Sequence, residues 1–386
     1  MTSESTGSPE QPLAGITVVE IGTSVAAPFA GQVLGDLGAR VVKIEKPEGG
    51  DDARLWGPPF WHGTSATFQS LNRNKLSVAL DLKIEAEREA LRDFICTEAH
   101  VVLQNMRPGL VERYQLDAQL IERAPQLVYC NLGAFGSLGP MRGRPGYDPM
   151  MQAFGGLMSI TGEAEQPPVR IGPSIVDIGA GMWSVIGILS ALYRSRETGR
   201  GGVVDTSLFE TALAWMTVPS AMTLAGSEPG RTGSEAAMLA PYKAYRACDG
   251  NYLIVAAGND NLFVKLCHEI GKPGWIDDSR FRTNADRLAN RSLLNGLLEQ
   301  EISQAPVAEW LRRLEAAGVP CAPLQSTGQV LEHPQTVALG MLQTVPDSPL
   351  RLMGLPLRFN EVRPTVKSAP PTLGQHSSII LKGAKV

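Results

Sequence analysis

With 386 residues, the chain exceeds the length at which a single hydrophobic core usually stops growing, so we expect two domains. Hydrophobic residues make up 43% of the chain and charged residues 19%, which is typical of a globular protein. The net charge of -4 and a pI near 5.8 exclude a broad basic surface, so no nucleic-acid partner is expected.

The N-terminal residues 1–12 are polar and lack the regions of a secretory signal, which predicts a disordered tail. The longest apolar run, residues 182–192, is interrupted by serine and glycine, so no membrane-spanning helix is expected. Five scattered cysteines without CxxC spacing indicate free thiols and a cytoplasmic location. The five histidines are isolated from one another, so no metal site is expected.

The first elements form a βαβ unit. Residues 16–21 are an apolar, β-branched run, residues 28–37 have helical spacing, and residues 40–45 return as a strand. This order predicts a parallel sheet. The first βα loop, residues 22–28, lacks the GxGxxG pattern, so it does not indicate a nicotinamide dinucleotide site. A helix is predicted at residues 85–96, and further strands at residues 76–80, 101–104 and 127–131.

The longest predicted helix begins near Asp177 and continues to about residue 198. Aspartate at this position most often caps the helix. The small residues 179–181 follow it and would leave space for a ligand beside the carboxylate. Because helix N–H groups favour the charged form, we expect a lowered pKa for Asp177. The residues alone leave capping and catalysis both open.

A second module follows a strand at residues 203–207 and a helix at 208–216. Gly, Ser, Pro and Ala dominate residues 220–239, which predicts a linker. A hairpin across Asp249-Gly250 joins predicted strands 243–248 and 252–256, and predicted helices follow at 261–270, 288–304 and 307–317. The predicted domains are a large domain at residues 13–224, a small domain at 225–330, and a C-terminal segment at 331–386 that returns to the large domain.

Several blocks stand in a specific order along the chain. They are Leu13-Ala-Gly-Ile-Thr-Val-Val-Glu-Ile, Leu37-Gly-Ala-Arg-Val-Val-Lys-Ile-Glu-Lys-Pro, Asn72-Arg-Asn-Lys, Gln104-Asn-Met-Arg-Pro-Gly, Gly146-Tyr-Asp, Gly155-Gly-Leu-Met-Ser-Ile-Thr-Gly and Thr198-Gly-Arg-Gly. In order and spacing, residues 13 to about 376 resemble the class III CoA-transferase family, also called the CaiB/BaiF type. Three blocks, Gly50-Asp-Asp-Ala-Arg-Leu-Trp-Gly-Pro-Pro-Phe, Ala257-Gly-Asn-Asp and Leu373-Gly-Gln-His, are most similar to the succinate–hydroxymethylglutarate branch.

The resemblance implies an α/β fold with a Rossmann-like large domain, a parallel sheet, a smaller α+β domain and an interlocked homodimer. It implies transfer of CoA from an acyl-CoA, such as succinyl-CoA, to a carboxylic acid, with a dicarboxylic acid expected. Asp177 matches the family's catalytic aspartate, which forms covalent aspartyl intermediates. Coenzyme A and acyl-CoA are then substrates, and no permanently bound cofactor is expected.

The resemblance also implies a set of CoA contacts: Val25, Ala26, Lys46, Leu80, Lys83, Asn105, Met106, Arg107, Arg113, Arg144, Tyr147 and Asp148. The cations in this set suit phosphate groups, although each is also explained as solvated surface charge. Arg54 is assigned to the distal carboxylate of the acceptor acid. Gly258 and Asn259 are assigned to a substrate-covering loop, which is not a glycine run here and therefore disfavours an oxalate-type substrate.

Two other functions stay open. Related α-methylacyl-CoA racemases have a histidine where this sequence has Tyr147, so an acyl-CoA racemase or epimerase is the alternative enzyme. A tyrosine, with an ordinary pKa of about 10, is poorly suited to deprotonating an α-carbon at neutral pH. A catalytically inactive CoA-binding subunit is the non-enzymatic alternative, and the presence of Asp177 argues against it.

Overall fold

The computed structural model describes residues 11–381, so the predicted tail at residues 1–12 lies almost entirely outside the described residues. The described chain forms two compact units. The first unit contains residues 11–157, 170–218 and 334–381, and the second contains residues 158–169 and 219–333. The predicted small domain, residues 225–330, falls within the second unit.

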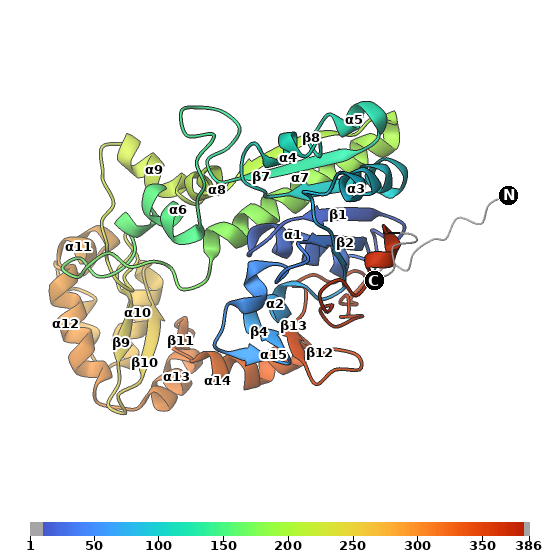
Figure 1. The fold of residues 1–386 in the computed structure, drawn as a ribbon. Helices are drawn as coiled ribbons and strands as arrows, with labels where there is room; N and C mark the ends of the chain where they lie inside the picture. The colour runs from blue at the N-terminus through green and yellow to red at the C-terminus, as the bar shows by residue number, and fades with distance from the viewer. Residues whose placement is uncertain (1–10, 382–386) are drawn as a thin grey trace. The chain divides into compact units, whose positions relative to one another are not determined.

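The first unit is built on a parallel sheet of six strands in the order β5-β2-β1-β6-β7-β8 (Figure 1). The strands are β1 (Thr17–Ile21), β2 (Arg40–Glu45), β5 (Lys75–Ala79), β6 (Val101–Gln104), β7 (Val128–Gly133) and β8 (Gly202–Ser207). The predicted α/β fold with a parallel sheet is therefore confirmed. From β1 the chain adds β2 and β5 on one side and then β6, β7 and β8 on the other, so the switch point of the sheet lies between β1 and β6. Doubly wound sheets form a ligand-binding crevice at this point.

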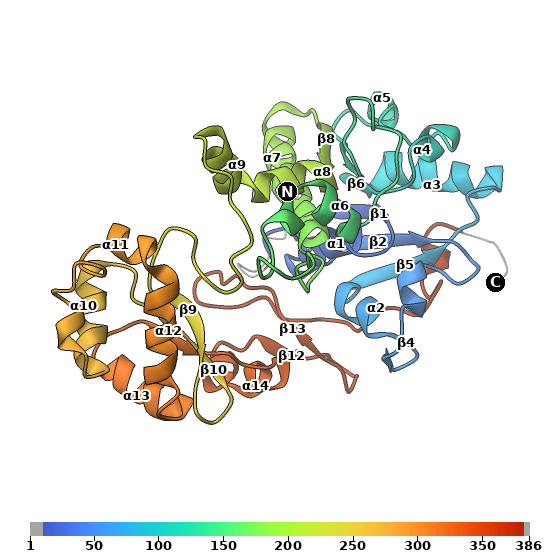
Figure 2. The ribbon, with the colours of Figure 1, turned by 90° about the vertical axis from the view of Figure 1, so that its left-hand side faces the viewer.

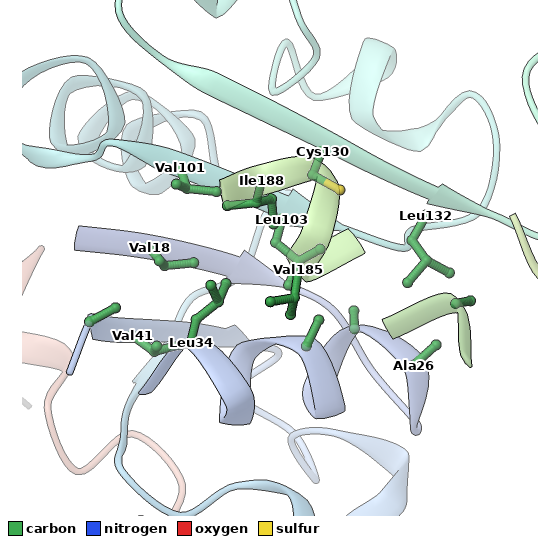
Figure 3. Packing of buried hydrophobic residues seen from close by; sticks show 14 of the residues in the cluster. Val18, Ala26, Leu34, Val41, Val101, Leu103, Cys130, Leu132, Val185 and Ile188 are labelled. Carbon is green, nitrogen blue, oxygen red and sulfur yellow. The ribbon is translucent and has the colours of Figure 1, made fainter. Parts of the chain in front are cut away.

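Helices cover both faces of this sheet. One face carries α1 (Ala26–Asp36), α7 (Ile175–Thr198) and α8 (Leu208–Trp215), and the other carries α3 (Glu85–Glu98) and α5 (Leu120–Arg123). Alternate strand residues point to opposite faces, so Val18 and Val19 enter different core clusters. Figure 3 shows Val185 and Ile188 of α7 packed against the sheet in the first of these clusters. Both faces of the sheet are thus closed by apolar packing.

Helix α7 has the length and hydropathy of a membrane span, and within the described residues it is the one helix that does. Its residues Val176, Ala180 and Ile188 are nevertheless fully buried against α1 and the sheet. Ile, Val and Leu give α7 its hydropathy, and the small residues Gly179 and Gly181 allow neighbouring elements to pack closely against it. We therefore interpret α7 as the core helix of the first unit.

The C-terminal segment covers the edge strand β5. His376 N donates to Ser77 O at 2.8 Å, and Ser77 N donates back to His376 Nδ1 at 3.2 Å. Gly374 N also donates to Ser77 Oγ at 3.0 Å, and Ala79 N donates to Ser377 Oγ at 3.1 Å. These bonds occupy backbone groups that an edge strand would otherwise expose.

The second unit packs helices on a three-stranded antiparallel sheet in the order β11-β10-β9 (Figure 2). Its strands are β9 (Tyr242–Arg246), β10 (Tyr252–Ala256) and β11 (Cys321–Pro323), and its helices include α10 (Asp260–Glu269), α11 (Asn284–Ala289), α12 (Arg291–Ile302) and α13 (Val307–Ala316). The predicted hairpin is confirmed. The helix predicted at 288–304 is confirmed over residues 291–302, which form α12, but residues 288 and 289 belong to α11, and Asn290 lies between the two helices.

Several short elements were not predicted. They are α2 (Ala66–Leu71), α4 (Leu110–Arg113), α6 (Asp148–Phe154), α9 (Thr217–Leu224), α14 (Thr327–Glu332), α15 (Pro334–Ala338) and the strand pairs β3 (Phe60–Trp61) with β4 (Thr64–Ser65) and β12 (Leu342–Thr344) with β13 (Arg351–Met353). Helix α9 replaces the first part of the predicted linker at 220–239. All of them have eight residues or fewer, too few to show a clear helical or strand period.

Candidate active site

A groove with a volume of about 720 Å³ opens in the first unit at the carboxyl ends of the parallel strands. The loops after β1, β2, β5 and β6 line it, together with the last residues of β7 and the first turns of α6 and α7. This is the switch point of the sheet, where the strand order reverses. Asp177, in the first turn of α7, is one of the lining residues.

Most of the residues expected to contact CoA lie around this groove. They are Val25, Ala26, Lys46, Leu80, Lys83, Asn105, Met106, Arg107, Arg144, Tyr147 and Asp148. Arg113 is exposed at the end of α4 and does not line the groove. The structure thus brings together residues that lie more than 120 positions apart in the sequence.

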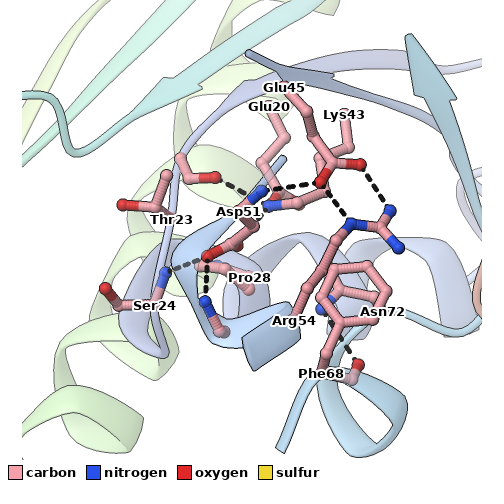
Figure 4. A network of polar contacts seen from close by, with 12 residues as sticks. Glu20, Thr23, Ser24, Pro28, Lys43, Glu45, Asp51, Arg54, Phe68 and Asn72 are labelled. Atoms are coloured by element: carbon pink, nitrogen blue, oxygen red, sulfur yellow. Dashed lines mark hydrogen bonds and ion pairs between the residues drawn. The ribbon is translucent and has the colours of Figure 1, made fainter. Parts of the chain in front are cut away.

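The first βα loop is fixed by polar contacts on both sides. Ser24, with a positive φ of 73°, donates its N–H to Asp51 Oδ1 at 3.0 Å (Figure 4). Thr23 N donates to Asn105 Oδ1 at 2.9 Å, and Asn105 Nδ2 donates to Thr23 O at 2.9 Å. The loop that precedes α1 is therefore held in one conformation at the edge of the groove.

Behind this loop lies a fully buried group of charges (Figure 4). Lys43 Nζ lies 2.8 Å from Glu20 Oε1 and 2.9 Å from Asp51 Oδ2, and it donates to Gly22 O at 2.7 Å. Lys75 Nζ lies 2.8 Å from the other oxygen of Glu20. Burial lowers the pKa of Lys43, but the surrounding carboxylates outweigh burial and raise it above its ordinary value. For Lys75 burial prevails and lowers the pKa to about 8.

Arg54 is not available to a substrate, which corrects its assignment to the acceptor carboxylate. Its guanidinium is buried, with Nε 2.8 Å and Nη2 2.7 Å from the two oxygens of Glu45. The same group lies over the Phe68 ring, 3.8 Å from the ring centre, and donates to Pro371 O at 3.2 Å. A bidentate carboxylate and an aromatic ring thus already occupy its edge and face. Arg54 thus joins the end of β2, helix α2 and the C-terminal segment behind the groove.

The carboxyl group of Asp177 has a pKa raised to about 7, so the lowered pKa expected from the sequence is wrong. Burial is the main cause, and the negative charge of Asp148 adds to it. A lowered pKa would require helix N–H groups that face the Asp177 side chain. In the structure, Asp148 Oδ1 accepts from Val176 N at 2.8 Å and from Asp177 N at 3.3 Å.

The small residues after Asp177 make room for neighbouring elements rather than for a ligand. A Cβ on Gly181 would lie 2.7 Å from Ala26 O, and one on Gly179 would lie 2.7 Å from the Trp215 ring. Ala180 is fully buried. Gly181 therefore allows the start of α1, with its adjoining loop, to approach the helix that carries Asp177.

The cations at the groove differ in their pairing. Lys46 Nζ lies 2.6 Å from Asp52 Oδ1, and both side chains are largely exposed. Within residues 11–381, no ion pair is formed by Lys83, Arg107 or Arg144. These three exposed cations suit an anionic ligand with several phosphate groups.

Gly258 and Asn259, which were assigned to a substrate-covering loop, belong to the second unit and make hydrogen bonds within it. Asn259 caps α10 by accepting from Leu262 N at 2.9 Å. Gly258 O accepts from Arg287 Nη2 at 3.2 Å. Both residues therefore have a structural role at the start of α10.

Sequence reasoning missed Asp51 and Trp56, which line the groove, and the buried charges Glu20 and Lys43. Glu20 did give a signal, since it is the single charged residue of the strand Thr17–Ile21, whereas Lys43 shares its strand with Arg40 and Glu45. A charge at such a position is buried and needs a partner. Within residues 11–381, no group of three or more His, Cys, Asp or Glu is arranged to hold a metal ion.

The model of the family described as "CoA-transferase family III" matches residues 13–377. The chain belongs to CoA-transferase family III. Among solved structures, this CoA-transferase is similar to a CaiB/BaiF family protein from Brucella suis, with 38% identity, a TM-score of 0.87, and coverage of 97% of this chain and 99% of that one. The fold is therefore shared over nearly the whole chain.

Curated relatives of this CoA-transferase act on several acids. A mouse succinyl-CoA:glutarate CoA-transferase is 34% identical over 96% of this chain and 86% of its own length. A succinate–glutarate CoA-transferase from Agrobacterium fabrum is 34% identical, with coverage of 96% and 95%. An acetyl-CoA:oxalate CoA-transferase from Acetobacter aceti is 36% identical, with coverage of 92% of each. Overall identity thus does not separate glutarate from oxalate as acceptor.

Proposed function

We propose that this enzyme transfers CoA from succinyl-CoA or a similar acyl-CoA to a dicarboxylic acid through covalent intermediates on Asp177. The observation that carries the proposal is the Asp177 carboxylate, which lines a 720 Å³ groove without a cationic partner among the described residues. The named acids of the relatives, glutarate and oxalate, are all dicarboxylates, which supports the acceptor class.

In the first half-reaction, an Asp177 oxygen attacks the thioester carbon of the acyl-CoA. The C–S bond breaks, CoA leaves as the thiolate, and a mixed anhydride forms between the acyl group and Asp177. The thiolate then attacks the Asp177 carbonyl carbon, which releases the donor acid as a carboxylate and leaves CoA bound to Asp177 as a thioester. The bound nucleophile must lie about 3–3.5 Å from the carbon it attacks.

In the second half-reaction, the acceptor carboxylate attacks the same Asp177 carbonyl carbon and displaces the CoA thiolate. The thiolate attacks the acyl carbon of the new anhydride, which yields the acceptor's CoA thioester and regenerates the Asp177 carboxylate. One thioester replaces another, so the overall free-energy change is small. Lys83, Arg107 and Arg144 are the residues we assign to the CoA phosphates.

Trapping the intermediate tests the mechanism. The enzyme is incubated with succinyl-CoA without an acceptor, quenched, digested and analysed by mass spectrometry. The peptide containing Asp177 should carry a CoA or succinyl adduct that hydroxylamine removes, and the Asp177→Asn variant should carry none. Acceptor-dependent transfer without any adduct on this peptide would overturn the covalent mechanism.

The same preparation separates the two alternative functions. A racemase would introduce deuterium from D₂O at the α-carbon of an acyl-CoA without a second acid. Among the described residues, no histidine lines the groove, so the structure adds no support for that alternative. An inactive CoA-binding subunit would bind CoA, as seen in a thermal shift, without exchange in any acid pair.

We also propose a homodimer, interlocked as the family resemblance implies. On α7, Met182, Trp183 and Ile186 expose 42–51% of their surface, and Leu213 of α8 exposes 48%. Exposed large apolar side chains on two neighbouring helices favour contact with a second copy of the chain. Light scattering after size exclusion should give twice the chain mass, and Trp183→Glu should shift the enzyme toward monomer. The predicted cytoplasmic location stays a prediction.

A further inference from the structure

The first turn of α7 leaves none of its N–H groups for the Asp177 side chain. Ile175 N donates to Pro173 O at 2.7 Å, and Ile178 N donates to Ser174 O at 2.9 Å. Asp148 Oδ1 accepts from the two residues between them, Val176 and Asp177. Ser174, directly before the helix, makes no side-chain capping bond. The helix is therefore capped from α6, by a residue 29 positions before Asp177.

Asp148 is held rigidly in this role. Its side chain is 2% exposed, and its second oxygen accepts from Gln152 Nε2 at 2.6 Å. Gln152 is fully buried, and its Oε1 accepts from Ile171 N at 2.8 Å. The pair on α6 thus binds both the start of α7 and the segment that leads into it.

The Asp177 carboxylate, unlike that of Asp148, accepts no hydrogen bond in the described part of the chain. Within residues 11–381, no donor reaches its oxygens, and Tyr147 and Asp148 are the titratable groups near it at the start of α6. The acidic side chains on the other elements packed against α7 bond to other partners, Asp36 to Arg73, Asp205 to Asn131 and Glu210 to Ser207. Asp148 is therefore the neighbouring charge that acts on Asp177.

We propose that Asp148 is a positioning residue that takes the N–H groups at the start of α7 and so keeps the Asp177 carboxylate free of hydrogen bonds beside a second negative charge. Nucleophilicity falls as the pKa of the attacking group falls, as thiols show. A carboxylate that the helix N–H groups stabilised would be a weaker nucleophile toward a thioester. The catalytic meaning of this arrangement rests on the proposed function, whereas the arrangement itself does not.

The test removes the charge of Asp148 but keeps a capping oxygen. In Asp148→Asn the side-chain oxygen still accepts from α7, because asparagine caps helices as well as aspartate does. The titration midpoint of Asp177 should fall by about one pH unit when the like charge is lost. It is measured by the pH dependence of carbodiimide modification of Asp177, read by peptide mass spectrometry. The acid limb of kcat/KM should move in the same direction.

Gln152→Leu is the matched control. It removes the bond to Asp148 and loosens the same segment without changing any charge, so it should leave the midpoint within about 0.2 pH unit of wild type. Asp148→Ser replaces Asp148→Asn if the latter does not fold. An unchanged midpoint in the charge-removing variant, or an equal shift in Gln152→Leu, would overturn the proposal. If the wild type transfers no CoA but the midpoint still moves, the proposed function fails and the positioning role stands.

Discussion

Two regions of the first unit differ in how their acidic groups are paired: the buried charges behind the first βα loop, and the carboxylates of Asp148 and Asp177 where α6 and α7 begin. Behind the loop, Lys43 and Lys75 pair with Glu20 at 2.8 Å, and Arg54 holds Glu45 with two bonds. At α7, Asp177 has no cationic partner among the described residues. The paired charges fix the loops that frame the groove, whereas the Asp177 carboxylate has no counter-charge among the described residues.

The pKa values follow the same division. Burial acts to raise the pKa of Glu45, but Arg54 and Lys43 prevail and lower it to about 2. Burial raises the pKa of Asp177 to about 7, and Asp148 adds to it. The same chemical group is thus held charged in one place and near its titration point in the other.

The largest effect is expected from removing the unmatched carboxylate. Asp177→Asn deletes the oxygen that attacks the thioester in the proposed mechanism, so the rate of CoA transfer from succinyl-CoA to glutarate should fall by about 10⁴-fold or more. Separation of the acyl-CoA products measures this rate. Calorimetric titration with CoA should show affinity within about threefold of wild type, since the phosphates are held elsewhere. Transfer at the wild-type rate would exclude Asp177 as the nucleophile.

Breaking the paired buried charges should instead destabilise the folded protein. Lys43→Met leaves Glu20 and Asp51 buried without their shared cation, which should lower the free energy of unfolding by about 3–5 kcal/mol. The control, Lys46→Met, breaks an exposed pair and should change it by less than about 0.5 kcal/mol. Urea denaturation measures both variants. Equal losses in the two would show that burial of the pair does not matter.

The pH dependence of turnover should reveal the pKa of Asp177. In the proposed mechanism Asp177 must be charged to attack, and burial raises its pKa to about 7. The value of kcat/KM should therefore rise about tenfold per pH unit below neutral pH and level off above it. Initial rates from pH 5 to 9 measure the profile. A profile that is flat down to pH 5 would mean that Asp177 keeps an ordinary carboxyl pKa.

The two regions should also change stability in opposite directions with pH. The folded pKa of Asp177 is raised above 3.8, so its ionisation lowers the free energy of unfolding as pH rises from about 4 to 7. Asp177→Asn should then be more stable than wild type at pH 8, by about 1–2 kcal/mol, and equally stable near pH 4. The folded pKa of Glu45 is lowered, so Glu45→Gln should differ from wild type above pH 4.5 and converge with it toward pH 2. Denaturation at several pH values would contradict this if both differences had the same sign.

The smallest effect is expected at the edge of the groove. Lys83 forms no ion pair in the described part of the chain, so Lys83→Ala should raise the KM for succinyl-CoA about three- to tenfold and leave kcat unchanged. Arg113→Ala is the control, because Arg113 does not line the groove, and its KM should stay at the wild-type value. A fall in kcat for Lys83→Ala would assign Lys83 to the chemical step.

The sequence by itself determined the parallel sheet of the first unit. Apolar β-branched runs such as residues 16–21 and 40–45, separated by a segment of helical spacing, favour strands of a covered parallel sheet. Local order also indicated the long helix that carries Asp177 and the hairpin across Asp249-Gly250. These features depend on side-chain period and turn residues that lie close together in the chain.

Only the tertiary structure decided how the charges are paired. A free acceptor site at Arg54 and a lowered pKa at Asp177 were both reasonable from local sequence, and both are wrong because of distant partners. Glu45 and Phe68 occupy Arg54, and Asp148 takes the N–H groups of α7. The protonation state of a carboxyl group depends on its burial and on every charge within a few ångströms, and the folded chain brings those charges from positions far apart in the sequence.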